Sequence, residues 1–234
     1  VIYGRQNIET WKPDVIVSHH DNTIRAAQMS RKLNVPFVFI CHNNLDGIHT
    51  MLGLNPSLVV FNTEWLKQKL WQPHMNFVIM HPPVFPEQHA TTPGTKVTLV
   101  NLNKDKGANV FYELARRMPH VDFLGVVGGH GTQIIRTDLP NVEIQEHNDD
   151  MKTNVWSKTR VLLMPSVYES YGMAGVEALA SGIPVIAHPT PGLKESQGAF
   201  GLFVDRDDIN GYEGTITSLM NDTNWKSASV LALK

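Results

Sequence analysis

The chain has 234 residues, of which 20 are Lys or Arg and 22 are Asp or Glu, giving a formal net charge of −2. This balance excludes a basic footprint for nucleic acid, and no apolar run is long enough to span a membrane. Cys41 is the sole cysteine, so no intrachain disulfide forms and a reducing, cytoplasmic setting is expected. The length is sufficient for one or two domains and leaves the oligomeric state open.

The first part of the chain alternates short apolar runs with segments of helical spacing. Strands are predicted at residues 15–18, 37–40, 59–62 and 77–80. Helices are predicted at residues 4–12, 24–33 and 64–70, the last capped by Asn62 and Thr63. This alternation predicts a partial Rossmann-like domain over residues 1–84. Because the chain begins at Val1 rather than Met, we expect upstream residues that complete this domain.

A break in the alternation follows Pro82 and Pro83. Residues 85–95 are polar and contain Gly and Thr, and we interpret them as a linker. The alternation then restarts over residues 96–234. Strands are predicted at 96–100, 122–127, 142–144, 161–164, 185–187 and 201–204, and helices at 109–118, 149–156, 172–180 and 209–220. The fold class is therefore α/β, with a second Rossmann-like domain after the linker.

Histidines follow two successive strands in the first domain. His19 and His20 come after the first of these strands, and His42 comes after the second. Because the carboxyl ends of parallel strands meet at one edge of a sheet, we expect these side chains at a common rim. Adjacent histidines are expected to point apart, which argues against a metal site, and no metal ligands are predicted. Surface or capping histidines and ligand-contacting histidines remain open as alternatives.

The segment 161–185, VLLMPSVYESYGMAGVEALASGIPV, reads as a strand, a loop, a helix and a second strand. Ligands of open parallel sheets bind where loops leave the carboxyl ends of strands. Glu169 lies in the loop, and Glu177 lies in a helix that is apolar on almost every face. The Glu177 carboxylate is therefore either on an exposed strip or half-buried and in need of donors such as a ligand diol. The N–H groups of Gly172 and Met173 at the helix start are suited to phosphate.

Four pieces of this segment together resemble the donor-site signature of retaining, family-4-type GT-B glycosyltransferases: Pro165-Ser166, residues 169–172, Glu177-Ala178 and residues 181–185. The stretches KPDVIVSHH and PFVFICHN are similar to acceptor-domain strands of that family. The resemblance implies two Rossmann-like domains facing a cleft, with the first domain short or truncated. It also implies sugar transfer from a UDP- or GDP-sugar type of donor to an acceptor hydroxyl, with retention and without metal or cofactor.

The resemblance also implies roles for individual residues. Glu169 would stabilise charge at the anomeric carbon, and Lys106 would neutralise the donor diphosphate. Glu177 would hold the ribose hydroxyls, whereas His19 and His42 would reach the donor sugar or the acceptor. Asn101 stands where the family has Arg, which leaves more of the diphosphate charge to Lys106. Further donor contacts are implied for Asn101, Lys104, Gly128, Gly129, Ser170, Tyr171, Gly172 and Met173.

Two alternatives remain open on the sequence alone. One is a nucleotide-sugar epimerase or phosphorylase on the same scaffold. The other is a non-catalytic nucleotide-sugar-binding module, which Asn101 and the short first domain favour. The spacing of Glu169 and Glu177 and the turn at residues 101–107 favour a transferase. The sequence does not identify the acceptor, which is a saccharide, lipid, protein, metabolite or modified nucleic acid.

Overall fold

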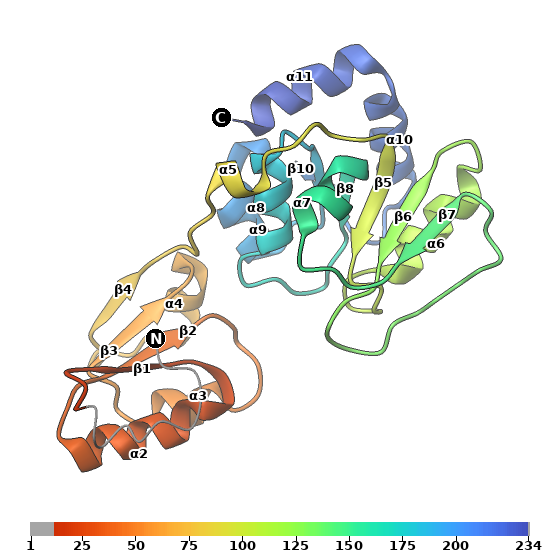
Figure 1. Ribbon diagram of the computed structural model, residues 1–234. Coiled ribbons are helices and arrows are strands. Elements are labelled where there is room, and N and C mark those ends of the chain that lie inside the picture. Colours follow the sequence, from red (N-terminus) through yellow and green to blue (C-terminus); the bar gives the residue numbers. More distant parts are fainter. Residues whose placement is uncertain (1–11, 234) are drawn as a thin grey trace. The chain divides into compact units, whose positions relative to one another are not determined.

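The computed structural model describes residues 12–233, so the helix predicted at residues 4–12 lies almost entirely outside the described part. The chain divides into two compact units, Val1–Pro82 and Pro83–Lys234, and each unit contains its own parallel sheet (Figure 1). No helix within residues 12–233 has the length and apolar character needed to cross a membrane. The predicted α/β fold with parallel sheets is confirmed.

The first unit has four parallel strands that lie side by side in chain order. These strands are β1 (Ile16–Ser18), β2 (Phe37–Cys41), β3 (Leu58–Phe61) and β4 (Phe77–Ile79). They are connected through η1 (His20–Asn22), α2 (Thr23–Leu33), α3 (Ile48–Leu52) and α4 (Glu64–Leu70), of which α3 was not predicted. Thr63 caps α4, because its hydroxyl accepts a hydrogen bond from the Leu66 N–H at 3.2 Å.

One apolar core holds the first unit together. It joins Phe39 and Phe61 of the sheet to Ala27 of α2 and Leu66 of α4. Buried and half-buried residues alternate along β2, whereas Val17 of the edge strand β1 is 54% exposed. This sheet is therefore fully packed on one face and more open on the other, as the period-two burial of its strands indicates.

The second unit has six parallel strands in the order β10-β9-β8-β5-β6-β7. Their bounds are β5 (Lys96–Val100), β6 (Phe123–Val126), β7 (Val142–Gln145), β8 (Thr159–Met164), β9 (Val185–Ala187) and β10 (Leu202–Phe203). The sheet is doubly wound, because the chain runs outward from β5 to β7, returns to β8 beside β5, and then runs outward to β10. The order of the strands reverses between β5 and β8, which is where sheets of this type bind ligands.

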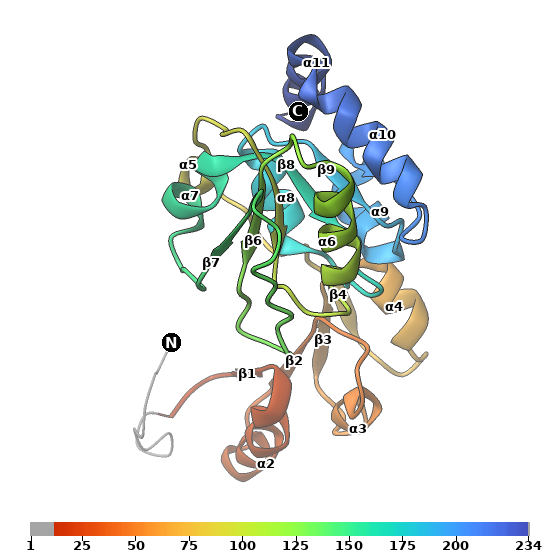
Figure 2. The same ribbon diagram turned by 90° about the vertical axis from the view of Figure 1, so that its right-hand side faces the viewer.

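Helices cover both faces of the second sheet. They are α5 (Pro86–His89), α6 (Ala108–Arg117), α7 (Met151–Asn154), η2 (Trp156–Lys158), α8 (Met173–Ala180), α9 (Pro191–Gln197), η3 (Gly198–Phe200), α10 (Ile209–Met220) and α11 (Asp222–Ala232). In Figure 2, α6 and α10 lie to the right of the strands, and α5 and α7 lie to the left. One core packs α6 and α10 on the sheet, and a second core packs α8 and α9 on it.

The segment predicted as a linker contains a short helix. Residues 86–89 form α5, which packs against α8 within the second unit. The Ser181 hydroxyl donates to the His89 carbonyl at 2.8 Å, so this segment is attached to the end of α8. The boundary between the two compact units falls between Pro82 and Pro83. The predicted domain limits at residues 84 and 96 remain a prediction.

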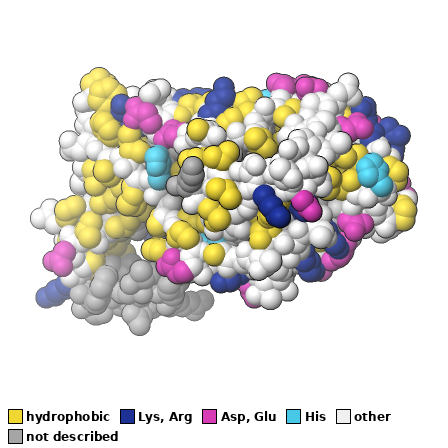
Figure 3. Space-filling model, turned by 90° about the horizontal axis from the view of Figure 1, so that it is seen from above, with side chains coloured by type: hydrophobic (Ala, Val, Ile, Leu, Met, Phe, Trp, Pro, Cys, Tyr) yellow, Lys and Arg dark blue, Asp and Glu magenta, His cyan; other side chains and the backbone are white. Residues whose placement is uncertain are grey.

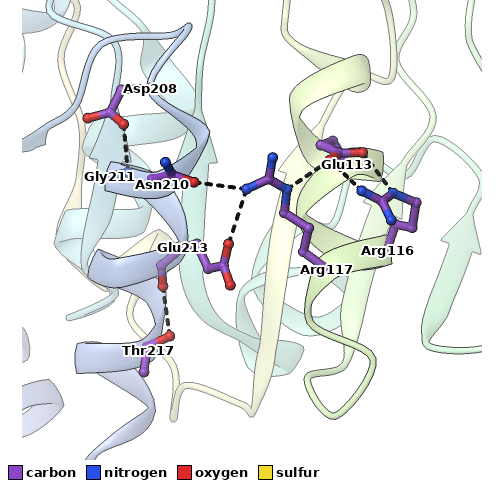
Figure 4. A network of polar contacts seen from close by, with 8 residues as sticks. All are labelled: Glu113, Arg116, Arg117, Asp208, Asn210, Gly211, Glu213 and Thr217. Atoms are coloured by element: carbon purple, nitrogen blue, oxygen red, sulfur yellow. Dashed lines mark hydrogen bonds and ion pairs between the residues drawn. The ribbon is translucent and has the colours of Figure 1, made fainter.

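Charged side chains on the surface are mixed in sign. On the face in Figure 3, Lys and Arg lie among Asp and Glu, and no large patch of one sign is visible on that face. Figure 4 shows a charged network between α6 and α10, in which Arg117 donates to Asn210 at 2.9 Å and lies 3.5 Å from Glu213. Arg117 also binds Glu113 on its own helix, at 2.8 Å. Because these pairs are solvent-exposed, we expect them to contribute little to stability.

Candidate functional site at the edge of the second sheet

Two loops meet where the strand order of the second sheet reverses. One loop follows β5 and carries Lys106, and the other follows β8 and carries Glu169. The Lys106 ammonium forms an ion pair with Glu169 Oε1, and the Ser166 hydroxyl donates to the same oxygen at 3.0 Å. The Glu169 side chain is only 12% exposed, against 31% for Lys106. Two residues 63 positions apart, both predicted for the site, are thus brought together.

Two glycines allow the loops to approach one another. Gly107 precedes α6 with a φ of 95°, and Gly172 precedes α8 with a φ of 86°. A Cβ on Gly107 would lie 2.4 Å from Cγ of Pro165, and a Cβ on Gly172 would lie 2.4 Å from Leu193. Glycine is required at both positions, because other residues meet both the left-handed backbone and a steric clash.

Asn101 contributes to the structure of the loop after β5. Its backbone has a φ of 71°, a region that Asn enters more readily than most residues. Its side-chain oxygen accepts a hydrogen bond from Gln133 at 2.7 Å. The Gln133 oxygen in turn accepts from the N–H groups of Leu102 and Gly128, both at 2.9 Å. Asn101 therefore holds the loop at Gly128 beside the loop after β5.

Arg206, which was not predicted, connects the two central loops. Its guanidinium donates to the carbonyl of Lys104 at 2.6 Å, to that of Asp105 at 2.9 Å and to that of Pro165 at 2.6 Å. Its backbone N–H donates to Nδ1 of His188 at 3.0 Å. The planar, multi-donor guanidinium is suited to bridging several carbonyls. In the sequence, Arg206 lies between two aspartates and has the pattern of a surface charge.

Gly192 supports the loop that carries Glu169. A Cβ at this position would lie 2.2 Å from the Glu169 carbonyl oxygen and 2.5 Å from that of Ser170. Thr190 caps α9, accepting from the Leu193 N–H at 3.2 Å, and so fixes the start of the helix that carries Gly192. Sequence reasoning missed this contact, because a Pro-Gly pair at the start of a helix has no feature that specifies a packing partner.

Glu177 lies half-buried on α8, with its side chain 17% exposed. Burial raises the pKa of this carboxyl, while the nearby His89, 3.9 Å away, lowers it. The buried indole N–H of Trp156 has no hydrogen-bond partner among the described residues. Of the two alternatives for this acid, the half-buried one is observed. The ionisable side chain 3.9 Å from it, His89, belongs to α5 and not to the Lys106–Glu169 pair.

The other predicted donor-site residues lie in the loops after β5, β6 and β8 or at the start of α8. Tyr171 is buried, and burial raises the pKa of its phenol. Met173, the first residue of α8, is 38% exposed. Lys104 is exposed, and a Cβ on Gly129 would meet no atom within 4 Å. The ligand contacts proposed for these residues remain predictions.

The three histidines of the first unit lie together. The ring centroids of His19 and His20 are 4.9 Å apart, and those of His20 and His42 are 4.1 Å apart. The expectation that adjacent histidines point apart is wrong here, because His20 adopts a positive φ of 55° that ends the extended strand geometry. Burial and the other two imidazoles lower the pKa of His42 to about 4. The predicted contacts of His19 and His42 with a sugar or acceptor remain predictions.

Solved structures with the same fold define the class of protein. The structure of Anabaena HepE with UDP and glucose matches 97% of this chain with a TM-score of 0.79, over 74% of its own length and at 17% identity. Sucrose-phosphate synthase from Thermosynechococcus elongatus matches 97% of the chain with a TM-score of 0.75, over 69% of its own length and at 17% identity. The fold is that of GT-B glycosyltransferases, as predicted.

The sequence then identifies the family. The pattern of the family described as glycosyl transferases group 1 matches residues 97–222, which is more than half of the chain. The chain belongs to this family. A D-inositol 3-phosphate glycosyltransferase of Mycobacterium sp. (strain KMS) is 36% identical over an alignment of length 131 that covers 50% of this chain and 30% of that protein. The O-antigen chain mannosyltransferase B of Escherichia coli is 29% identical over 72 residues, 31% of this chain and 19% of that protein. The chain thus spans less than a third of these relatives.

Proposed function

We propose that this protein transfers a sugar from a UDP- or GDP-sugar type of donor to an acceptor hydroxyl, with retention of the anomeric configuration and without a metal in the transfer site. The observation that carries the proposal is the Lys106–Glu169 pair at the reversal of strand order, inside the part that matches the family. The complexes of HepE with UDP and glucose support a nucleotide sugar as the donor class. The absence of any cysteine pair supports a cytoplasmic setting.

Lys106 supplies positive charge for the departing diphosphate. Its ammonium is the more exposed partner of the ion pair, so it can exchange the Glu169 carboxylate for phosphate oxygens when the donor binds. The N–H groups of Gly172 and Met173 at the start of α8 add a helix terminus that favours negative charge. Lys104 lies on the same loop and is exposed, which suits it to a second, weaker contact with the diphosphate.

Glu169 acts on the sugar once Lys106 has turned to the phosphates. Its carboxylate then faces the anomeric carbon and stabilises the positive charge that develops there. The bond from the anomeric carbon to the phosphate oxygen breaks as the bond to the acceptor oxygen forms on the same face. The departing phosphate oxygen takes the acceptor proton. This route needs no covalent enzyme intermediate, so Glu169 is not assigned the nucleophile role of a glycoside hydrolase.

The nucleotide binds along the remaining parts of the edge. Glu177 accepts hydrogen bonds from the ribose hydroxyls, which supply the donors that its half-buried carboxylate needs. Gly128 and Gly129 line the nucleotide side, and Asn101 holds the Gly128 loop in place through Gln133. Main-chain groups of Ser170 and Tyr171 position the sugar. His19 and His42 of the first unit serve the donor sugar or the acceptor.

A donor panel tests the proposal. The protein is incubated with UDP-, GDP-, ADP- and dTDP-sugars, and nucleotide release is measured with and without candidate acceptors. We expect release with one class of donor and its loss in Glu169→Gln. Isomerised sugar without nucleotide release would indicate an epimerase. If no donor releases nucleotide but calorimetry detects nucleotide binding, the protein is a non-catalytic binding module. Either result overturns the proposed transfer.

A further inference from the structure

A cluster of three imidazoles lies in the first unit, and it includes His19 and His42, which the proposed transfer assigns to the donor sugar or the acceptor. The ligand nitrogens of His19, His20 and His42 all lie within 4.8 Å of one another. The Nε2 atoms of His20 and His42 are 2.7 Å apart. Among the side chains that the structure describes, no carboxylate forms an ion pair with any of the three rings. The cluster therefore consists of three nitrogen bases with no acidic partner to explain their assembly.

The topology of the sheet explains why the three rings converge. Strands β1 and β2 are parallel neighbours, with Ser18 paired with Phe39, so the residues that follow them emerge at one edge. His19 is extended, with a φ of −147°, and His20 turns the chain with its positive φ. This change of conformation lets two consecutive rings share one side. Histidine, like Asn and Asp, enters the left-handed region more readily than most residues, so His20 accommodates this turn.

The distances fit one bound transition-metal ion. Zinc takes imidazole nitrogens at about 2.0–2.1 Å in a tetrahedral arrangement, which places ligand nitrogens about 3.3 Å from one another. The observed separations, 2.7 Å for one pair and at most 4.8 Å for the rest, bracket that value. Small side-chain rotations therefore bring the three rings to a common ion. Imidazole is a good ligand for zinc and related ions, and poor for magnesium or calcium.

A cavity adjoins the cluster and supplies room for a fourth ligand. It has a volume of about 140 Å³ and is lined by His20 and His42 together with Asn43, Asp46 and apolar side chains. A zinc ion held by three histidines keeps its fourth position for water or another small ligand. Asp46 lines the same cavity and offers a carboxylate that can orient such a water.

We propose that His19, His20 and His42 bind one Zn²⁺ ion per chain, with the fourth position open toward the cavity lined by Asp46. The alternative is a metal-free cluster, in which one imidazole of His20 and His42 donates a hydrogen bond to the other. That alternative has one hydrogen bond, between His20 and His42, and leaves His19 with ring contacts only, its centroid 5.3 Å from that of His42. Zinc on this cluster would also occupy nitrogens that the proposed transfer assigns to substrate, so added zinc would then inhibit transfer.

Metal binding is tested without any nucleotide sugar, so its outcome is independent of the proposed transferase activity. The chelator-treated full chain is titrated with Zn²⁺ by calorimetry and with Co²⁺ by visible absorption. We expect one ion per chain, a Kd in the micromolar range or tighter, and the intense band of tetrahedral Co²⁺. In His20→Asn, which keeps a residue suited to the left-handed backbone, we expect at least about 100-fold weaker binding.

His74→Ala is the matched control, because His74 is an exposed histidine of the same unit outside the cluster. We expect it to bind metal as the wild type does. His42→Gln provides a second variant in case His20→Asn does not fold, and thermal unfolding with and without Zn²⁺ checks folding in each. Zinc should raise the Tm of the wild type and of His74→Ala only. Absence of binding, or equal affinity in the cluster variants, would overturn the proposal.

Discussion

The two sheets present different chemistry at their carboxyl edges. In the second unit, the loops after β5 and β8 bring opposite charges together, as Lys106 and Glu169 show. In the first unit, the segments after β1 and β2 bring together three imidazoles. The same structural position, the end of parallel strands, thus produces a charged pair in one unit and a cluster of imidazoles in the other.

This difference follows from what surrounds each edge. The second sheet is covered on both faces, so its strands are mostly apolar, and Lys106 and Glu169 lie in the loops that follow them. There, Arg206 and Gln133 hold the loops through bonds to main-chain groups. In the first unit, the edge is shaped by one turn at His20. We therefore expect the second edge to be the more sensitive to substitution.

The largest expected effect is on turnover at the second edge. Glu169→Gln keeps the size of the side chain but removes the charge that the proposed transfer uses. We expect a loss of turnover on the order of 10²–10³-fold, similar to losing one electrostatic contact to a transition state, with nucleotide affinity retained. Nucleotide release and calorimetry measure the two quantities. Glu213→Gln on α10 is the control, and unchanged kinetics in Glu169→Gln would rule out the assigned role.

A similar loss is expected when the partner of Glu169 is removed. Lys106→Ala deletes the ammonium that the proposed transfer assigns to the diphosphate, and it leaves Glu169 with Ser166 as a hydrogen-bond donor. We expect turnover to fall about 10–100-fold, with a smaller change in nucleotide affinity. Lys152→Ala, at an exposed helix of the same unit, is the comparison for a general loss of charge. Full activity in Lys106→Ala would show that the Lys106–Glu169 pair has no role in the reaction. The proposed functional difference between the two edges would then be wrong.

The Glu177 carboxylate is expected to lower the stability of the protein at pH 7 and to strengthen nucleotide binding. Because burial raises its pKa, the folded state favours the protonated carboxyl, so stability is lost as pH rises from the ordinary value of 4.5 through the raised value. Glu177→Gln should therefore unfold at a higher temperature than wild type at pH 7, and the difference should shrink toward pH 4. Nucleotide affinity should fall about 10–100-fold, the cost of hydrogen bonds to a charged group. Calorimetry and thermal melts across this pH range decide both points. Equal affinity, or a lower Tm at pH 7, contradicts the assignment.

A pair of glycine substitutions tests how tightly the second edge is packed. Gly192→Ala places a methyl group against the Glu169 and Ser170 carbonyls. We expect the free energy of unfolding to fall by about 1–3 kcal/mol, together with lower turnover. Gly214→Ala is the matched control, because its methyl group meets nothing within 4 Å and lies within α10. For Gly214→Ala we expect the free energy of unfolding to rise by about 0.5–1 kcal/mol. Chemical denaturation measures both, and equal effects would show that the loop is not packed as described.

The smallest expected effect concerns Arg206. Arg206→Lys keeps the charge but loses the fork that spans three carbonyls, and we expect a drop of a few-fold in turnover and about 1 kcal/mol in stability. Arg117→Lys, in the exposed network between α6 and α10, serves as the comparison and should alter neither turnover nor stability measurably. If Arg206→Lys behaves like Arg117→Lys, the bridge between the loops is dispensable.

The order of strands and helices was largely predictable from the sequence. Apolar runs such as residues 161–164 mark buried strands, and the glycines at positions 107 and 172 mark helix starts. Short or weakly patterned helices were missed, namely α3, α5, α9 and α11. α3 and α5 are too short to show a period, and α11 leaves Val230 and Leu231 exposed, which blurs its apolar face.

Only those residues of the candidate site that belong to a recognisable sequence motif were predictable. Lys106 and Glu169 were both predicted and do meet. Arg206, Gln133 and Gly192 were missed, because each acts on main-chain atoms of a loop distant in sequence. Such contacts depend on the path of the backbone, which side-chain patterns do not encode. The meeting of His19 with His20 was missed for a similar reason, since it depends on one backbone angle.

The side-chain amide of Gln133 makes the second edge vulnerable to chemical ageing. Its oxygen accepts two backbone hydrogen bonds, and its nitrogen faces three oxygens, those of Asn101, His130 and Gly131. Deamidation, the change Gln133→Glu, would replace that nitrogen with an oxygen and set a negative charge against all three. A single hydrolytic event would thus loosen the Gly128 loop while leaving the hydrophobic cores untouched. The durability of this edge in stored protein is then set by one amide bond.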